Sequence, residues 1–122
     1  MNKIFVCSAF RGDTDDNIRK TKEYCRWIVK ECGAIPIAPH LLFPQFLNDN
    51  NEEERQLGIN MGLELLVDCN ELYYFGDRVT QGMATEINKA QEMHIPVHYI
   101  LENEIKSNQN GNGGFVYEQH LI

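Results

Sequence analysis

Glu86 is the residue whose type and position best fit a chemical role. It ends a stretch, Glu71–Glu86, that begins as a short apolar and aromatic run, breaks at Gly76-Asp77 and resumes near Gly82 with helical spacing. This pattern predicts a strand, a loop and a helix. Ligands of open parallel sheets bind beyond the carboxyl ends of the strands, so we expect this loop to form one wall of a pocket. Glu86 would face the pocket from near the start of the helix.

A carboxylate in that position has a chemical use. The positive end of the helix dipole favours its ionised form, and an ionised Glu beside a sugar ring can attack the anomeric carbon or stabilise a cation that develops there. The alternative is structural, because acidic residues are common in first helical turns for the dipole and for solubility.

A second candidate segment, Ser8–Asp13, follows the first predicted strand, Lys3–Cys7. It leads into a helix with good N-terminal capping residues. A hydroxyl, an Arg and free backbone N–H groups at such a junction suit a ribose or a phosphate. The segment matches neither the dinucleotide fingerprint nor a Walker loop. Alternatively, Arg11 pairs with an aspartate of the following helix, which carries Asp13, Asp15 and Asp16.

The segment Pro39–Leu47 is unusually apolar for a loop, so its side chains should cover a ligand base, a neighbouring subunit or the domain core. His40 is the residue of this loop expected to touch a ligand, although a His that ends a strand is often structural. Asn48–Asn51 is predicted to be a solvated turn. Arg55 could reach the pocket from the next helix, but its neighbouring glutamates favour a solvated ion pair.

Strands and helices alternate along the chain, which predicts right-handed parallel crossovers. Pro36 confines the second strand to an edge of the sheet. Val29 and Cys32 of the first helix and Leu57 of the second fall on the faces predicted to be buried. The predicted strands are 3–7, 35–38, 71–75 and 95–100, and the predicted helices are 13–32, 52–69 and 82–94.

The 122 residues suffice for one domain, which we place at 1–101. Residues 102–122 are rich in Asn, Gly and Ser before a short apolar end. We expect a flexible linker and a C-terminal segment that adds a fifth strand, packs on the domain or crosses to a partner subunit.

The composition narrows the function. A content of 43% hydrophobic and 24% charged residues is typical of a soluble globular protein, and no stretch could cross a bilayer, so we expect a cytoplasmic protein with no membrane partner. The net charge of -7 argues against a nucleic acid polymer as the main partner. The four cysteines show no metal-ligand spacing with the histidines, so we expect buried free thiols, no metal site and no cofactor.

Three motifs together resemble the nucleoside 2-deoxyribosyltransferase-like superfamily, in particular its short bacterial and phage members. They are Cys-Ser-Ala-Phe-Arg-Gly at residues 7–12, Pro39-His40 with Phe43-Pro44, and Gly-Met-Ala-Thr-Glu-Ile at residues 82–87. The resemblance covers about residues 3–100. It implies a flavodoxin-like or Rossmann-like α/β fold with three layers. The open parallel sheet would have four to five strands in the order 2-1-3-4, with helices on both faces. Members of the superfamily are usually homo-oligomers.

The resemblance also implies roles for individual residues. Glu86 would be the nucleophile that cleaves the N-glycosidic bond of a nucleoside or nucleotide. The sugar or its 5′-phosphate would contact Ser8, Phe10, Arg11 and Gly12 in the first loop, and the turn with Thr80, Gly82 and Met83 would help to hold it. The transferases carry an Asp near the positions of Asn60–Leu63, and this chain has none there. Ala9 stands where the nucleotide N-hydrolases have a Ser.

Two classes of function follow. The first is an enzyme that cleaves or transfers at the N-glycosidic bond of a nucleoside or nucleoside monophosphate. The second is a protein that binds a nucleotide without turnover, for example an NAD-derived signal in a conflict between phage and host. A metal-dependent hydrolase ranks third, because the sequence lacks a ligand cluster.

Overall fold

Four parallel strands form one open sheet in the order β2-β1-β3-β4. The structure is a computed structural model that describes residues 1–106. The order and the parallel pairing confirm the predicted fold class. The strands are β1 (Lys3–Cys7), β2 (Ile35–Ile37), β3 (Glu71–Phe75) and β4 (Val97–Ile100).

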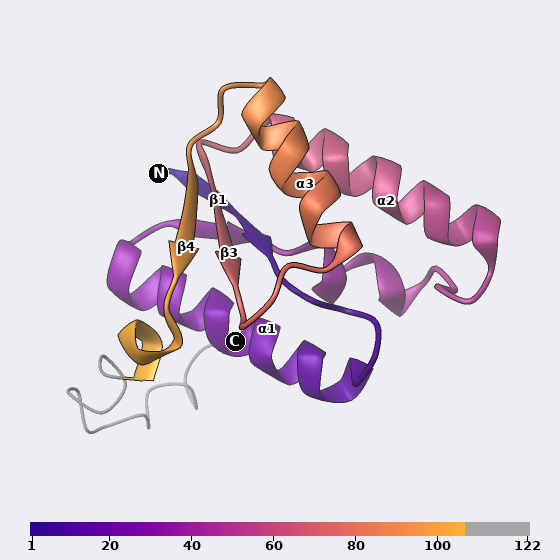
Figure 1. Ribbon diagram of the computed structural model, residues 1–122, viewed down its shortest axis with the longest axis horizontal. Helices are drawn as coiled ribbons and strands as arrows, with labels where there is room; N and C mark the ends of the chain where they lie inside the picture. Colours follow the sequence, from indigo (N-terminus) through magenta and orange to yellow (C-terminus); the bar gives the residue numbers. More distant parts are fainter. Residues whose placement is uncertain (107–122) are drawn as a thin grey trace.

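Helices cover both faces of the sheet, which gives three layers (Figure 1). On one face lies α1 (Thr14–Trp27), which continues as the π-helical turn η1 (Ile28–Cys32). On the other face lie α2 (Glu52–Val67) and α3 (Gln81–Glu92). Two short 3-10 helices, η2 (Pro39–Leu41) and η3 (Phe43–Gln45), connect β2 to α2.

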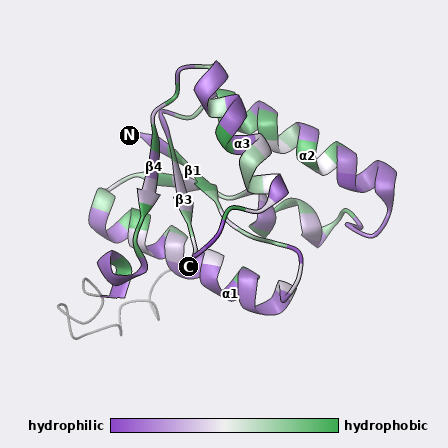
Figure 2. Ribbon diagram, viewed as in Figure 1, coloured by the Kyte–Doolittle hydropathy of each residue, from purple (hydrophilic) through white to green (hydrophobic). Residues whose placement is uncertain are grey.

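The side chains of β1 alternate between two cores. Ile4 and Val6 pack with residues of α1 and η1, while Phe5 and Cys7 pack with residues of α2 and α3. A central strand buried on both faces must be apolar throughout, which explains the run Ile-Phe-Val-Cys. Figure 2 shows the contrast between this strand and the hydrophilic first turns of α2.

Side-chain caps set the helix starts that the sequence predicts. Asp13 accepts a hydrogen bond from the backbone N–H of Asp16, and Asn51 and Thr80 cap α2 and α3 in the same way. Gly33 ends η1 with a φ of 60°, a conformation that glycine adopts without a Cβ penalty.

Three residues of the first two helices that were predicted to be buried are exposed. In the first helix the buried residues are Thr21, Tyr24 and Ile28, whereas Val29 is 45% exposed and Cys32 also faces solvent. The wider π-turn changes the rotation per residue, so the spacing of 3.6 no longer holds beyond Ile28. The other exception is Leu57, which is 48% exposed. Its half of α2 lies alongside the loop after β2 rather than over the sheet, since the α2 residues in the core cluster, Leu63 and Leu66, come later.

The predicted flexible linker is wrong over its first residues. Residues 102–106 are helical, and Ile105 is 3% exposed in the core cluster on the α1 side. Burial of this Ile in the core contributes to docking the short helical segment on the domain. The rest of the predicted linker, and the predicted fifth strand or partner contact, lie outside the described residues. Within residues 1–106, no helix combines the length and apolar character needed to cross a membrane.

The two leucines of α2 with opposite environments test this packing. Leu66 is fully buried, so Leu66→Ala should lower the free energy of unfolding by about 2–5 kcal/mol through lost burial and a residual cavity. Leu57→Ala removes the same atoms from an exposed site and should cost less than about 0.5 kcal/mol. Urea denaturation of both variants measures the difference, and equal losses would contradict the described orientation of α2.

Candidate functional site

A cleft of about 580 Å³ opens at the carboxyl edge of the sheet. Its walls come from the loops that follow β1, β2 and β3 and from the first turns of α2 and α3. This is where ligands bind in open parallel sheets, and the volume lies within the range of small-molecule sites.

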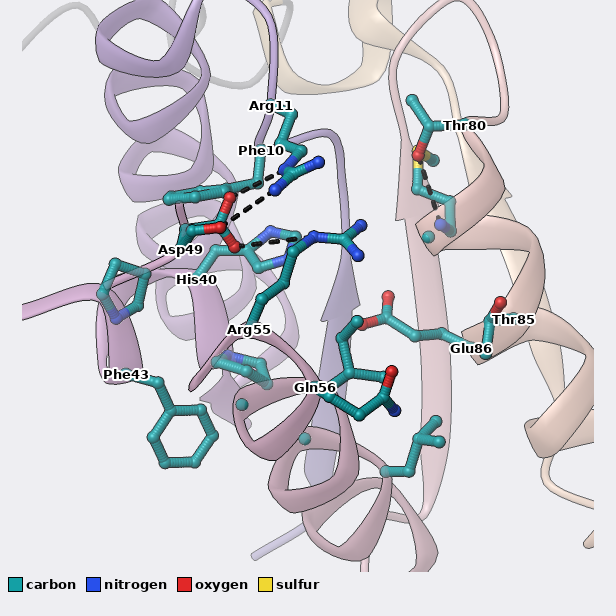
Figure 3. A pocket seen from close by; sticks show the side chains of 18 of the residues that line it. Phe10, Arg11, His40, Phe43, Asp49, Arg55, Gln56, Thr80, Thr85 and Glu86 are labelled. Atoms are coloured by element: carbon teal, nitrogen blue, oxygen red, sulfur yellow. Dashed lines mark hydrogen bonds and ion pairs between the residues drawn. The ribbon is translucent and has the colours of Figure 1, made fainter. Parts of the chain in front are cut away.

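All but one of the predicted site residues line this cleft. The exception is Gly12, which is exposed and turns the chain with a φ of 105°. A contact between Gly12 and a ligand therefore has no support in the cleft geometry. The predicted residues that line the cleft, most of them drawn in Figure 3, are Ser8, Phe10, Arg11, His40, Thr80, Gly82, Met83 and Glu86.

Glu86 lies in the second turn of α3 and points into the cleft (Figure 3). Its Oε1 is buried and has no hydrogen-bond partner within residues 1–106. Burial raises the pKa of Glu86 from its ordinary value of 4.5 to about 7, against a smaller opposing effect of a hydrogen bond from the Cys7 thiol. The sequence led us to expect that the helix dipole would favour the ionised form. Desolvation outweighs that effect, because the dipole acts mainly in the first turn.

The other carboxylates of the cleft are engaged by the protein. Asp49 accepts a hydrogen bond from Arg11, and Glu54 accepts one from the backbone N–H of Asn48. A buried carboxyl group without such partners is costly to keep in a folded protein. Glu86 therefore stands out as the carboxyl group that is left for a ligand.

Cys7, at the end of β1, lies beneath Glu86. Its thiol donates a hydrogen bond to the carbonyl of Met83, 3.6 Å away, and has a single hydrogen to divide between this carbonyl and the Glu86 carboxylate. Burial, with an added effect of the negative charge of Glu86, raises the pKa of Cys7 far above its usual value. The thiol thus acts as a hydrogen-bond donor. The sequence correctly predicted a buried free thiol but carried no signal for its contact with Glu86.

The Ser8 side chain can offer the cleft a hydrogen-bond acceptor, because its own hydrogen is used within the protein. Its Oγ lies 3.0 Å from Oγ1 of Thr21, and the Thr21 hydroxyl donates its hydrogen to the carbonyl of Asn17 at 2.7 Å. Ser8 must then donate to Thr21. Its remaining lone pairs can accept a hydrogen bond from a ligand hydroxyl.

Asp49 lies between two arginines at the mouth of the cleft (Figure 3). The Nε of Arg11 donates to Oδ2 of Asp49 at 2.7 Å, and Nη2 of Arg11 donates to the Asp49 carbonyl at 2.9 Å. The Nε of Arg55 approaches Oδ1 of Asp49 at 3.9 Å. The alternative in which Arg11 pairs with Asp13, Asp15 or Asp16 is wrong, because Arg11 pairs with Asp49. Arg55 likewise approaches Asp49 rather than its neighbouring glutamates. The turn 48–51 is exposed in part, but Asp49 within it is a site residue that sequence analysis missed.

His40 packs against Phe10, with ring centroids 5.0 Å apart. Burial lowers the pKa of His40 to about 4, with a smaller opposing effect of Asp49, so the imidazole is neutral near pH 7. Its Nδ1 is buried and has no partner in the described part of the chain. A neutral imidazole with an open nitrogen can recognise a polar atom of a ligand.

The turn before α3 presents one hydroxyl to the cleft. Oγ1 of Thr80 accepts a hydrogen bond from the backbone N–H of Met83 at 3.2 Å, which leaves its own hydrogen available. The Met83 side chain belongs to the core cluster below. Across residues 1–106, no group of three or more His, Cys, Asp or Glu side chains is arranged to hold a metal ion.

Comparison with known proteins gives a family and a fold. A family model described as "Domain of unknown function (DUF7768)" matches residues 2–100. No curated protein matches the chain. Among solved structures, the 2-deoxyribosyltransferase of Bacillus psychrosaccharolyticus is similar with a TM-score of 0.61 and 18% sequence identity, over 81% of this chain and 72% of that one. At this identity the likeness establishes the shared α/β fold.

The raised pKa of Glu86 makes stability depend on pH. The folded state binds this proton more tightly than the unfolded state, so the resulting stabilisation is present below pH 4.5 and is lost as the pH rises through about 7. Glu86→Gln removes the titrating group. From pH 4.5 to pH 8, the unfolding free energy of the wild type should fall by about 2–3 kcal/mol relative to that of the variant. Urea denaturation across this range gives the unfolding free energies of both proteins. If the two free energies change with pH in parallel, the carboxyl group is solvated and the prediction is wrong.

Proposed function

This chain belongs to the family described as Domain of unknown function (DUF7768), and we propose that it cleaves or transfers at the N-glycosidic bond of a nucleoside or nucleoside monophosphate. One observation carries the proposal. The carboxyl group of Glu86, whose buried Oε1 has no hydrogen-bond partner within residues 1–106, lies in the same cleft as Ser8 and Arg11. A nucleoside that spans these residues would bring its anomeric carbon to the carboxylate.

The chemistry requires the ionised form of Glu86. The carboxylate attacks C1′ of the sugar, or stabilises the positive charge that develops there, while the C1′–N bond breaks and its electron pair passes to the base. Water or a second base then takes the glycosyl group from Glu86. The water-poor surroundings that raise the pKa of Glu86 also strengthen its attraction for the developing cation.

Polar groups from two loops can hold the sugar. The Ser8 oxygen can accept a hydrogen bond from a ribose hydroxyl, and the Thr80 hydroxyl can donate one from the opposite wall. Arg11 can leave Asp49 and bind an anionic group of the ligand instead. The Arg11 side chain is 54% exposed, and exposed ion pairs contribute little to stability. Fixing the sugar between both loops would align C1′ with the carboxylate.

The fold comparison supports the same class. The similar solved structure is named a 2-deoxyribosyltransferase, and it shares the arrangement of strands and helices that forms this cleft. The proposal for this chain rests on its own residues, with the likeness as support.

Binding without turnover is the second candidate, and one observation favours it. Asp49 and Glu54, the other carboxylates that line the cleft, are both engaged by neighbouring groups. Many glycosidases need a second carboxyl group as a general acid. A protein that holds a nucleotide without breaking its glycosidic bond would not need one.

Substitution of Glu86 separates the two candidates. Wild-type protein should release free base from at least one member of a panel of nucleosides, nucleoside monophosphates and NAD, followed by chromatography. Glu86→Gln and Glu86→Ala should lower kcat/KM at least about 10³-fold, because the attacking group is lost. Glu92→Gln, at the exposed end of the same helix, should retain wild-type activity. Tight binding of a panel member without any base release would favour the second candidate.

The pH profile should report the same carboxyl group. Since the reaction needs ionised Glu86, kcat/KM should rise about tenfold per pH unit below neutrality and level off above a pKa of about 7. Initial rates of base release from pH 5 to pH 9, with protein shown by circular dichroism to be folded throughout, provide the profile. A rate that falls as the pH rises through 7 would require a protonated Glu86 and would contradict its role as nucleophile.

A further inference from the structure

We propose that Arg55 stabilises the departing base of this reaction, and that the base is a 6-oxopurine. The inference rests on the proposed function, because it assigns the leaving-group side of the same cleft. It begins from the division of the cleft into a polar part and an apolar part.

The apolar part lies along η3 and α2. The loops after β1 and β3 contribute the Ser8 and Thr80 hydroxyl groups, whereas η3, α2 and the loop between them contribute aromatic and aliphatic side chains. A flat heterocyclic base favours such walls, and a sugar favours the hydroxyl groups. The apolar lining residues of η3 and α2, with the loop between them, are Phe43, Pro44, Leu47, Ile59 and Leu63.

Arg55 belongs to this apolar side. It comes from the first turns of α2 and extends into the cleft opposite Glu86, with Gln56 beside it (Figure 3). Its side chain is 29% exposed. A base against the α2 wall, with its sugar at Glu86, would lie beside this guanidinium.

The guanidinium of Arg55 is weakly engaged by the protein. Its ion pair within residues 1–106 is the 3.9 Å approach to Asp49, whose Oδ2 and carbonyl are already bonded to Arg11. This leaves a cation with free N–H groups facing the cleft.

Such a cation would assist bond cleavage. When the C1′–N bond breaks, its electron pair stays on the base, which departs as an anion while C1′ bonds to the Glu86 carboxylate. Hydrogen bonds from the guanidinium disperse the negative charge of the base, and Arg55 keeps its protons. Water then attacks C1′, Glu86 leaves, and the proton of that water goes to the base anion. The sum is nucleoside plus water giving sugar plus neutral base.

The forked arrangement of N–H groups on the Arg55 guanidinium, called the fork below, also selects a kind of base. A guanidinium donates two parallel hydrogen bonds, which match the adjacent O6 and N7 acceptors of guanine and hypoxanthine. Adenine presents an amino donor in place of O6, so one of the two hydrogen bonds is lost. Inosine and guanosine, or their deoxy forms, should therefore be better substrates than adenosine.

The test compares a poor and a good leaving group. For inosine, Arg55→Met should lower kcat/KM by about 10- to 100-fold, since charged hydrogen bonds to the departing base are lost. For 4-nitrophenyl riboside, whose leaving group carries its negative charge without help, the loss should stay below about threefold. The variant should also bind hypoxanthine about tenfold more weakly in calorimetric titration. Arg55→Lys should keep much of the inosine rate but lose the preference for inosine over adenosine, because lysine retains the charge without the fork.

Two variants separate this inference from the proposed function. Glu86→Gln should slow both substrates alike, and Arg19→Met, which removes an arginine from the exposed face of α1, should slow neither. Equal losses on both substrates in a folded Arg55→Met protein would overturn the leaving-group role while the role of Glu86 stands. An unchanged preference for inosine in Arg55→Lys would overturn the choice of base. Failure of the wild type to release either leaving group would overturn the proposed function and this inference together.

Discussion

The burial of the Glu86 carboxyl group at the end of a parallel sheet, with no partner for its Oε1 in the described part of the chain, is the constraint on which the site depends. Glu86 stays in place because Met83 and Ala90, one turn on either side of it along α3, are fully packed against the sheet. These contacts fix the rotation of the helix and therefore the direction of the carboxyl group. The cost appears as the raised pKa of Glu86.

The cleft itself follows from the strand order. After β1 the chain crosses to α1 on one face of the sheet, while after β3 it crosses to α3 on the other face (Figure 1). The two loops therefore leave neighbouring strands in opposite directions. A crevice must open between them, and this is the switch point at which α/β sheets bind ligands. The loop after β2 closes the crevice from the side of α2, with His40 and Phe10 in contact.

Local sequence signals were sufficient for most of the elements and for part of the site. Capping residues, a proline at the edge strand and the apolar run of β1 each report on their own neighbourhood, whereas the full strand order was implied by the family resemblance. The loop residues that line the cleft could be predicted because they directly follow strands. Signals that depend on distant partners were missed: Asp49 meets Arg11 across 38 residues, and Thr21 fixes Ser8 from the next helix. The π-helical turn exposes Val29, and the spacing of apolar residues along the chain gave no sign of it.

The Asp49 ion pairs have a consequence for ligand exchange. Both arginines and the aspartate are partly exposed, and contacts of this kind contribute about 0–1 kcal/mol, so room-temperature motion breaks and re-forms them. Arg11 and Arg55 can then swing aside without any rearrangement of the layers beneath. Counterions in solution weaken these contacts further, because screening acts on charges that water can reach. The entrance is thus adjustable, while the floor, made by β1 and α3, stays rigid.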